Sequence, residues 1–113
     1  MRESKIEKSL KNKVQNMGGI ALKFVSPGIA GVPDRIVLIP NGKVVFVELK
    51  APGKTMRPIQ LKRKSQLEYL GFKVYLIDSL QGVDSFVREV FHWFLNHIII
   101  KNMQGTGLLK NQV

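Results

Sequence analysis

The fold is decided by a stretch near the middle of the chain, which reads Ile36-Val37-Leu38-Ile39-Pro40-Asn41-Gly42-Lys43-Val44-Val45-Phe46-Val47-Glu48-Leu49-Lys50. Two apolar runs rich in β-branched residues flank a Pro-Asn-Gly segment, which is the pattern of a β-hairpin. Proline at the first loop position and glycine at the third favour a three-residue loop. In that loop Pro40 and Asn41 form a type I turn and Gly42 is left-handed.

Loop length sets which residues of the two strands face each other. A three-residue loop pairs Ile39 with Lys43 and, counting back, sets Asp34 opposite Glu48. A two-residue Asn-Gly turn would set Asp34 opposite Leu49 instead, on the wrong face of the sheet for Glu48. Because the turn residues favour the longer loop, we expect the two carboxylates to lie side by side.

Three charged side chains should gather where this hairpin ends. Side chains alternate between the faces of a strand, so Glu48 and Lys50 share a face with Asp34. Charges two apart are usually the solvated face of a strand, but these end an apolar strand expected to be central, where unpaired charges are costly. Two adjacent carboxylates repel unless a cation or a proton lies between them. The trio therefore indicates a site in which oxygen ligands hold Mg²⁺ for phosphodiester cleavage and an amine stabilises developing charge.

Periodicity elsewhere predicts an α/β sandwich on a mixed sheet. The expected elements outside the hairpin are a helix at 3–17, a strand at 20–25, a helix at 58–70, a strand at 72–77 and a helix at 81–96. The second helix should make a right-handed crossover. Residues 1–100 then form one domain, and residues 101–113, which lose the pattern, form a flexible C-terminal tail.

Composition points to a polyanionic partner. The 113 residues carry 18 Lys and Arg against 8 Asp and Glu, a net charge of +10, which suits DNA, RNA or an anionic membrane. No apolar stretch approaches the roughly 20 residues needed to span a bilayer, and no secretory apolar segment follows Met1. Zero cysteines and two histidines exclude thiolate sites and a dedicated zinc cage. We therefore expect a soluble, cytoplasmic protein with no membrane partner, no small-molecule cofactor and any metal bound by oxygen.

Two acids in the first helix are candidates to complete the metal shell. Glu3 lies near the centre of the apolar stripe and Glu7 toward its edge. A fraying helix end and the helix dipole would also explain Glu3, so Glu3 and Glu7 both remain candidates for the further metal ligand.

The segment after the acidic pair has no acid between Leu49 and Leu67 and is rich in Lys and Arg. Gln60 should face the active edge of the sheet, where it can hydrogen-bond the scissile phosphate or its water. We predict that this segment binds the phosphate backbone. The residues proposed for this are Lys54, Arg57, Lys62, Arg63 and Lys64.

Three motifs in order resemble the virus-type replication-repair nuclease (VRR-NUC) domain, a branch of the PD-(D/E)xK nuclease superfamily. They are Gly31-Val32-Pro33-Asp34-Arg35, Val47-Glu48-Leu49-Lys50-Ala51-Pro52-Gly53 and Arg57-Pro58-Ile59-Gln60. The resemblance covers residues 3–80. It implies a restriction-endonuclease-like α-β-β-β-α-β core with a mixed sheet flanked by helices, followed by the C-terminal helix.

The resemblance also implies roles for these residues. Asp34, Glu48 and the backbone carbonyl of Leu49 would be metal ligands, and Lys50 would be the catalytic lysine. The family's first-helix acid precedes an apolar residue by three positions, which favours Glu3 as the further ligand. Gln60 matches the family glutamine.

The activity implied is that of a Mg²⁺- or Mn²⁺-dependent endodeoxyribonuclease, typical of bacteriophages, homodimeric, and similar to Holliday-junction resolvases that cut branched DNA. We place the dimer surface on the C-terminal helix, at His92, Trp93 and 98–100. Alternatives are a restriction-like or nicking endonuclease on ordinary duplex DNA, and a non-catalytic DNA-binding module. A basic RNA-associated protein would explain the charge but not the acidic pair.

Overall fold

A computed structural model describes residues 2–104, with side chains placed for residues 2–92. Its elements, in chain order, are α1 (Glu3–Asn16), β1 (Ile20–Lys23), β2 (Arg35–Ile39), β3 (Lys43–Leu49), α2 (Pro58–Tyr69), β4 (Val74–Ile77) and α3 (Leu80–Gln104). The strands form one sheet in the order β1-β2-β3-β4. The first two pairings are antiparallel and the β3–β4 pairing is parallel, which confirms the mixed sheet and the central position of β3.

The hairpin has the predicted register but not the predicted turn. Ile39 pairs with Lys43 and Arg35 with Val47, so the strand alignment continues to Asp34 opposite Glu48. The type I turn is wrong, because Asn41 has a positive φ of 73° as well as Gly42 at 81°. Asparagine tolerates this left-handed region since its short side chain can hydrogen-bond locally. Loop length, which sets the register, is the same in either conformation.

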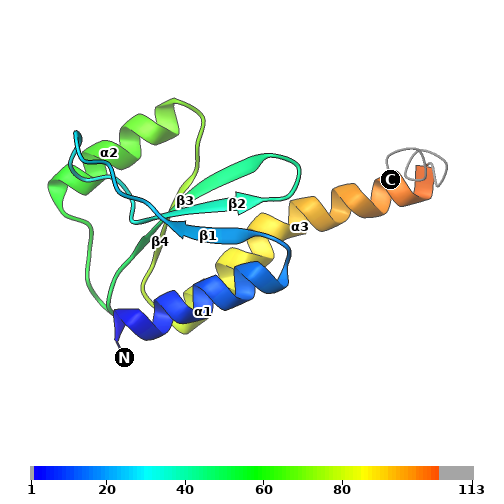
Figure 1. Ribbon diagram of the computed structural model, residues 1–113, viewed down its shortest axis with the longest axis horizontal. Helices are drawn as coiled ribbons and strands as arrows, with labels where there is room; N and C mark the ends of the chain where they lie inside the picture. Colours follow the sequence, from blue (N-terminus) through cyan, green and yellow to red (C-terminus); the bar gives the residue numbers. More distant parts are fainter. Residues whose placement is uncertain (1, 105–113) are drawn as a thin grey trace.

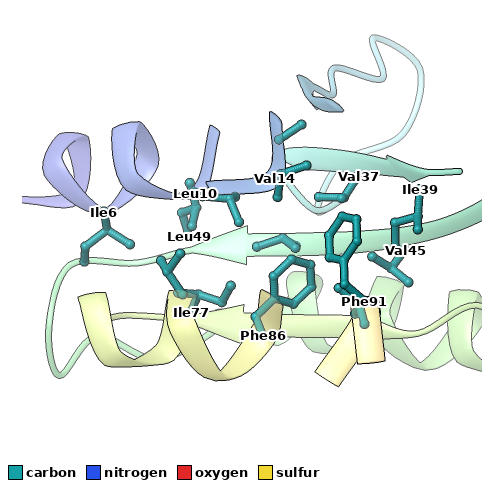
Figure 2. Packing of buried hydrophobic residues seen from close by; sticks show 14 residues of the cluster. Ile6, Leu10, Val14, Val37, Ile39, Val45, Leu49, Ile77, Phe86 and Phe91 are labelled. Carbon is teal, nitrogen blue, oxygen red and sulfur yellow. The ribbon is translucent and has the colours of Figure 1, made fainter. Parts of the chain in front are cut away.

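One face of the sheet is covered by α1 and α3, and the other by α2 (Figure 1). A cluster of buried apolar side chains fills the space between the sheet and the helices α1 and α3 (Figure 2). Fully burying one Leu or Ile side chain stabilises a fold by about 1.5–3 kcal/mol, so this layer supplies most of the stability. The cluster comprises Ile6, Leu10, Val14, Ala21, Val37, Ile39, Val45, Val47, Leu49, Ile77, Val83, Phe86, Val90 and Phe91.

The layer between the sheet and α2 is thinner. Phe46, on the face of β3 opposite Val45 and Val47, packs against Phe24 and, edge to face, against Phe72, at ring-centroid distances of 5.8 Å and 5.5 Å. The only buried residue of α2 is polar, Gln60. This face therefore leaves room for a polar site beneath the start of α2.

The C-terminal helix is longer than predicted. α3 continues to Gln104 instead of ending near Asn96, because no glycine or proline interrupts the chain between Gly82 and Gly105. Four residues of the predicted tail are thus helical, and residues 105–113 lie outside the described residues. Among the described helices none is both long and apolar enough to cross a membrane.

Candidate active site

The two predicted carboxylates lie side by side at the end of the β2–β3 ladder. The backbone N–H of Asp34 donates to Glu48 Oε1 at 3.2 Å. The backbone N–H of Leu49 donates to Asp34 Oδ1 at 3.1 Å. Each carboxylate is therefore oriented by the backbone of the opposite strand, and the hairpin register that the loop sets brings them together.

The ladder stops here for a local reason. Continuing the register would bring Pro33 opposite Leu49, and proline has no N–H to donate. The Leu49 N–H bonds the Asp34 side chain instead, while the next N–H, that of Lys50, donates to Ile77 of β4 on the other side. Since the N–H and C=O of one strand residue point to the same side, the Leu49 carbonyl faces the acidic pair. It is thus available as an oxygen ligand.

Burial and mutual repulsion disfavour the charged forms of Asp34 and Glu48. Burial raises the pKa of Asp34 above its usual range, although the hydrogen bond from Leu49 opposes the shift. Burial also raises the pKa of Glu48, the negative charge of Asp34 adds to the shift, and the charge of Lys50 opposes it. Two carboxylates with raised pKa values and shared hydrogen bonds form a site that a cation would stabilise.

Lys50 lies on the same face, as predicted. Its Nζ is 4.0 Å from Glu48 Oε2, and the side chain is 18% exposed against 4% for Glu48. The ammonium group is therefore close to the acidic pair yet reachable from solvent, where an incoming anion can meet it.

Gln60 contacts the same carboxylate oxygen of Glu48 as Lys50 does. Its Nε2 donates to Glu48 Oε2 at 2.5 Å, and its Oε1 accepts the backbone N–H of Arg57 at 2.8 Å. The second bond caps the N-terminus of α2 and fixes the amide so that its NH₂ group must face Glu48. The sequence predicted Gln60 at the site, and its partner in this structure is the carboxylate.

The two acids of α1 have different partners. Glu7 forms an ion pair with Arg35, whose Nη2 lies 2.9 Å from Glu7 Oε2. Glu3 is exposed, but its charge raises the pKa values of both Asp34 and Glu48. Within the described residues no three acidic or histidine side chains form a metal-binding group. Metal ligation by Glu3 thus stays a prediction, and Glu7 has a structural partner.

Arg35 is a site neighbour that the sequence argument missed. It is only 6% exposed, and its charge lowers the pKa of the adjacent Asp34. The signal was present in the alternation of β2, because Arg35 falls on the same face as Val37 and Ile39, which are core residues. A charge on that face needs a partner, and Glu7, whose side chain is 42% exposed, supplies it.

The basic residues predicted to bind DNA divide into two groups. Lys54, Arg57 and Lys62 are exposed near the start of α2. Lys64 is 3.3 Å from Glu68 one turn later, and Arg63 donates from Nε to the Ala30 carbonyl at 2.9 Å. DNA contact by all five residues stays a prediction.

The predicted dimer surface is only partly visible. His92 is exposed on α3, whereas the side chains of Trp93 and residues 98–100 lie outside the described side chains.

The donor set fits a hard divalent cation. Two carboxylates and a strand carbonyl offer only oxygen, which Mg²⁺ and Mn²⁺ prefer. The raised pKa values show that the two negative charges are unfavourable where they are, so binding a cation between them should be favourable. The exposed basic residues Lys54, Arg57 and Lys62 suit an anionic substrate.

Known proteins share both this sequence and this architecture. No protein-family model matches the chain. A protein of Acyrthosiphon pisum secondary endosymbiont phage 1, named "Putative nuclease p44", is 54% identical over 90 residues, which are 80% of this chain and 96% of the phage protein. A solved structure described as a VRR_NUC domain superposes with a TM-score of 0.72 at 29% identity, covering 76% of this chain and 94% of the other. The chain therefore belongs to the VRR-NUC family of nucleases, in its bacteriophage type.

Proposed function

We propose that this chain is a Mg²⁺-dependent endodeoxyribonuclease, with Mn²⁺ able to substitute, that hydrolyses phosphodiester bonds through Asp34, Glu48 and Lys50. The observation that carries the proposal is the adjacency of two carboxylates with raised pKa values, with Lys50 Nζ 4.0 Å from Glu48. The name of the phage relative, a nuclease, supports the same activity.

Each residue has a distinct task in this proposal. Asp34, Glu48 and the Leu49 carbonyl hold the cation, and Glu3 is a further candidate ligand. The cation, when bound, would supply Lewis acidity and lower the pKa of water. Lys50 orients the attacking water and donates to the phosphate oxygen on which negative charge grows. As water attacks in line, it loses a proton to solvent, the P–O bond to the leaving group breaks, and the leaving oxygen takes up a proton. Gln60 keeps Glu48 in place throughout.

We propose branched DNA, in particular the four-way junction, as the substrate and a homodimer as the active assembly. Symmetric resolution of a junction needs two cuts, and one chain offers one site. A twofold dimer presents two such sites in fixed relation. The exposed residues Lys54, Arg57 and Lys62 would bind the phosphates that flank the cut.

The experiment uses the purified protein with labelled four-way, flap, splayed and linear DNA, each in Mg²⁺ and in EDTA. We expect cutting of the junction in Mg²⁺ and none in EDTA. Equal cutting of junction and linear duplex would favour a restriction-like or nicking enzyme. Binding without cutting on any substrate would instead identify a DNA-binding module. Sedimentation at micromolar protein tests the dimer, and a monomer alone would contradict it.

Lys50→Ala tests the assignment of the lysine. Removing one donor from a transition-state anion costs about 10²–10³ in rate, so cleavage in Mg²⁺ should fall by that factor while much of the DNA affinity remains. Lys11→Ala, on the exposed outer face of α1, removes the same charge far from the acidic pair and is the matched control. Cleavage by Lys50→Ala at the parental rate would refute the assignment.

A further inference from the structure

Two consecutive basic residues of α2 stand in different environments. Lys62 is exposed, and Arg63 is half-buried. Arg63 donates from Nε to the carbonyl oxygen of Ala30 at 2.9 Å and from Nη1 to Gln66 Oε1. Two of the five guanidinium N–H groups of Arg63 are therefore taken by intramolecular acceptors, which also fix the orientation of the group.

Ala30 belongs to the loop that delivers Asp34. Residues 24–34 connect β1 to β2, and the loop closes where the Phe24 N–H donates to the Asp34 carbonyl at 2.8 Å. A second contact lies beside the first, because a methyl group added to Gly31 would be 2.6 Å from the Ile59 carbonyl oxygen. Ile59 and Arg63 are four residues apart and so share one face of α2. The loop is therefore held against α2 at two points one turn apart.

The same two turns of α2 also hold the other carboxylate. Gln60 donates to Glu48 Oε2, and Arg63 fixes the loop that ends at Asp34. The helix thus supports both halves of the acidic pair, one directly and one through the loop.

We propose that Arg63 is a positioning residue that fixes the Asp34 loop to α2, and that this role, and not a phosphate contact, is its contribution to cleavage. The proposal rests on the proposed function, since the position of Asp34 matters because of the chemistry there. It replaces the sequence-based prediction for Arg63 and leaves the one for Lys62 intact.

The test compares Arg63→Met with Lys62→Gln in two assays. Misplacing a catalytic group by about 1 Å can cost about 10²-fold in rate. We therefore expect Arg63→Met to lower single-turnover cleavage of saturating junction DNA in Mg²⁺ about 10- to 100-fold with its DNA Kd unchanged. Lys62→Gln should instead weaken binding and reduce the salt slope of log K by about 0.9, the value for one phosphate contact. Arg63→Lys, which keeps a donor of similar reach, should recover much of the rate.

A readout that needs no activity accompanies these assays. Amide hydrogen exchange at Phe24, whose N–H closes the loop on the Asp34 carbonyl, should rise about tenfold in Arg63→Met, the effect of losing roughly one hydrogen bond to a charged group. It should be unchanged in Lys11→Met, which loses a charge but no loop contact. A reduced salt slope in Arg63→Met, or unchanged loop exchange, would overturn the proposal. If the wild-type chain cut no DNA, the proposed activity would fail, and loop exchange would still decide whether Arg63 fixes the loop.

Discussion

Gly31→Ala should be among the more damaging single-methyl additions to this chain. Gly31 has a φ of 83°, and the new methyl group would lie 2.6 Å from the Ile59 carbonyl oxygen and 2.9 Å from Ile59 Cγ1. The first feature strains any non-glycine residue. The second requires the loop to move away from α2, because the nearest atom belongs to the backbone of a helix.

The magnitude follows from three contributions. Left-handed backbone costs alanine about 1–2 kcal/mol, and the reduced entropy of the unfolded chain returns about 0.4–1 kcal/mol. Overpacking against a fixed backbone adds about 1–3 kcal/mol. We expect a loss of about 1–4.6 kcal/mol in the free energy of unfolding, from the sum of these ranges.

Gly42→Ala is the matched control. Gly42 has almost the same φ, 81°, but its added methyl group would meet nothing within 4 Å. It should therefore lose only the backbone contribution less the entropic return, about 0–1.6 kcal/mol. Both variants are measured by urea unfolding at one pH in EDTA. Equal losses in the two variants would refute the close contact between the loop and α2.

Two further predictions concern charge. Burial raises the pKa values of Asp34 and Glu48, so the folded protein holds these carboxyl protons more tightly than the unfolded chain does. The stability that this provides is complete below about pH 4, where the unfolded carboxyls are also protonated, and is lost as pH rises through the raised pKa values. Asp34→Asn should therefore raise the Tm of the metal-free protein at about pH 8, by about 4–8 °C for each kcal/mol gained, with no gain near pH 4 and no stabilisation by Mg²⁺. A thermal scan at about pH 8 in which Asp34→Asn has the same Tm as the wild type, or a lower one, would contradict this. For the second, Glu7→Gln removes the Glu7 charge beside the Arg35 guanidinium, whose side chain is 8% exposed. Because the Glu7 side chain is 42% exposed, the cost should be only about 1 kcal/mol. Adding Arg35→Met to Glu7→Gln should recover part of that loss in chemical denaturation, and a double variant less stable than the single one would argue against this ion pair.

Local patterns were enough for the parts of the fold that short-range physics governs. The alternation of β3 separated the core residues Val45 and Val47 from Glu48. Proline 58 at the first helical position and Gly71 after the last marked α2. The detail of the hairpin turn was missed because Asn41 and Gly42 can each take positive φ, and turn statistics do not rank the two arrangements when the register is the same.

What the sequence determined by itself is the hairpin register, and with it the adjacency of Asp34, Glu48 and Lys50, because the turn residues favour a three-residue loop and a side-chain period of two then leaves only one pairing. What only the tertiary structure decided is how distant segments use their charges. Glu7 pairs with Arg35, Gln60 turns its NH₂ group to Glu48, and Arg63 binds a loop carbonyl 33 residues away. These contacts form because α1 and α2 pack onto opposite faces of the sheet (Figure 1). The periodicity within one segment does not show which residues of another segment it will contact.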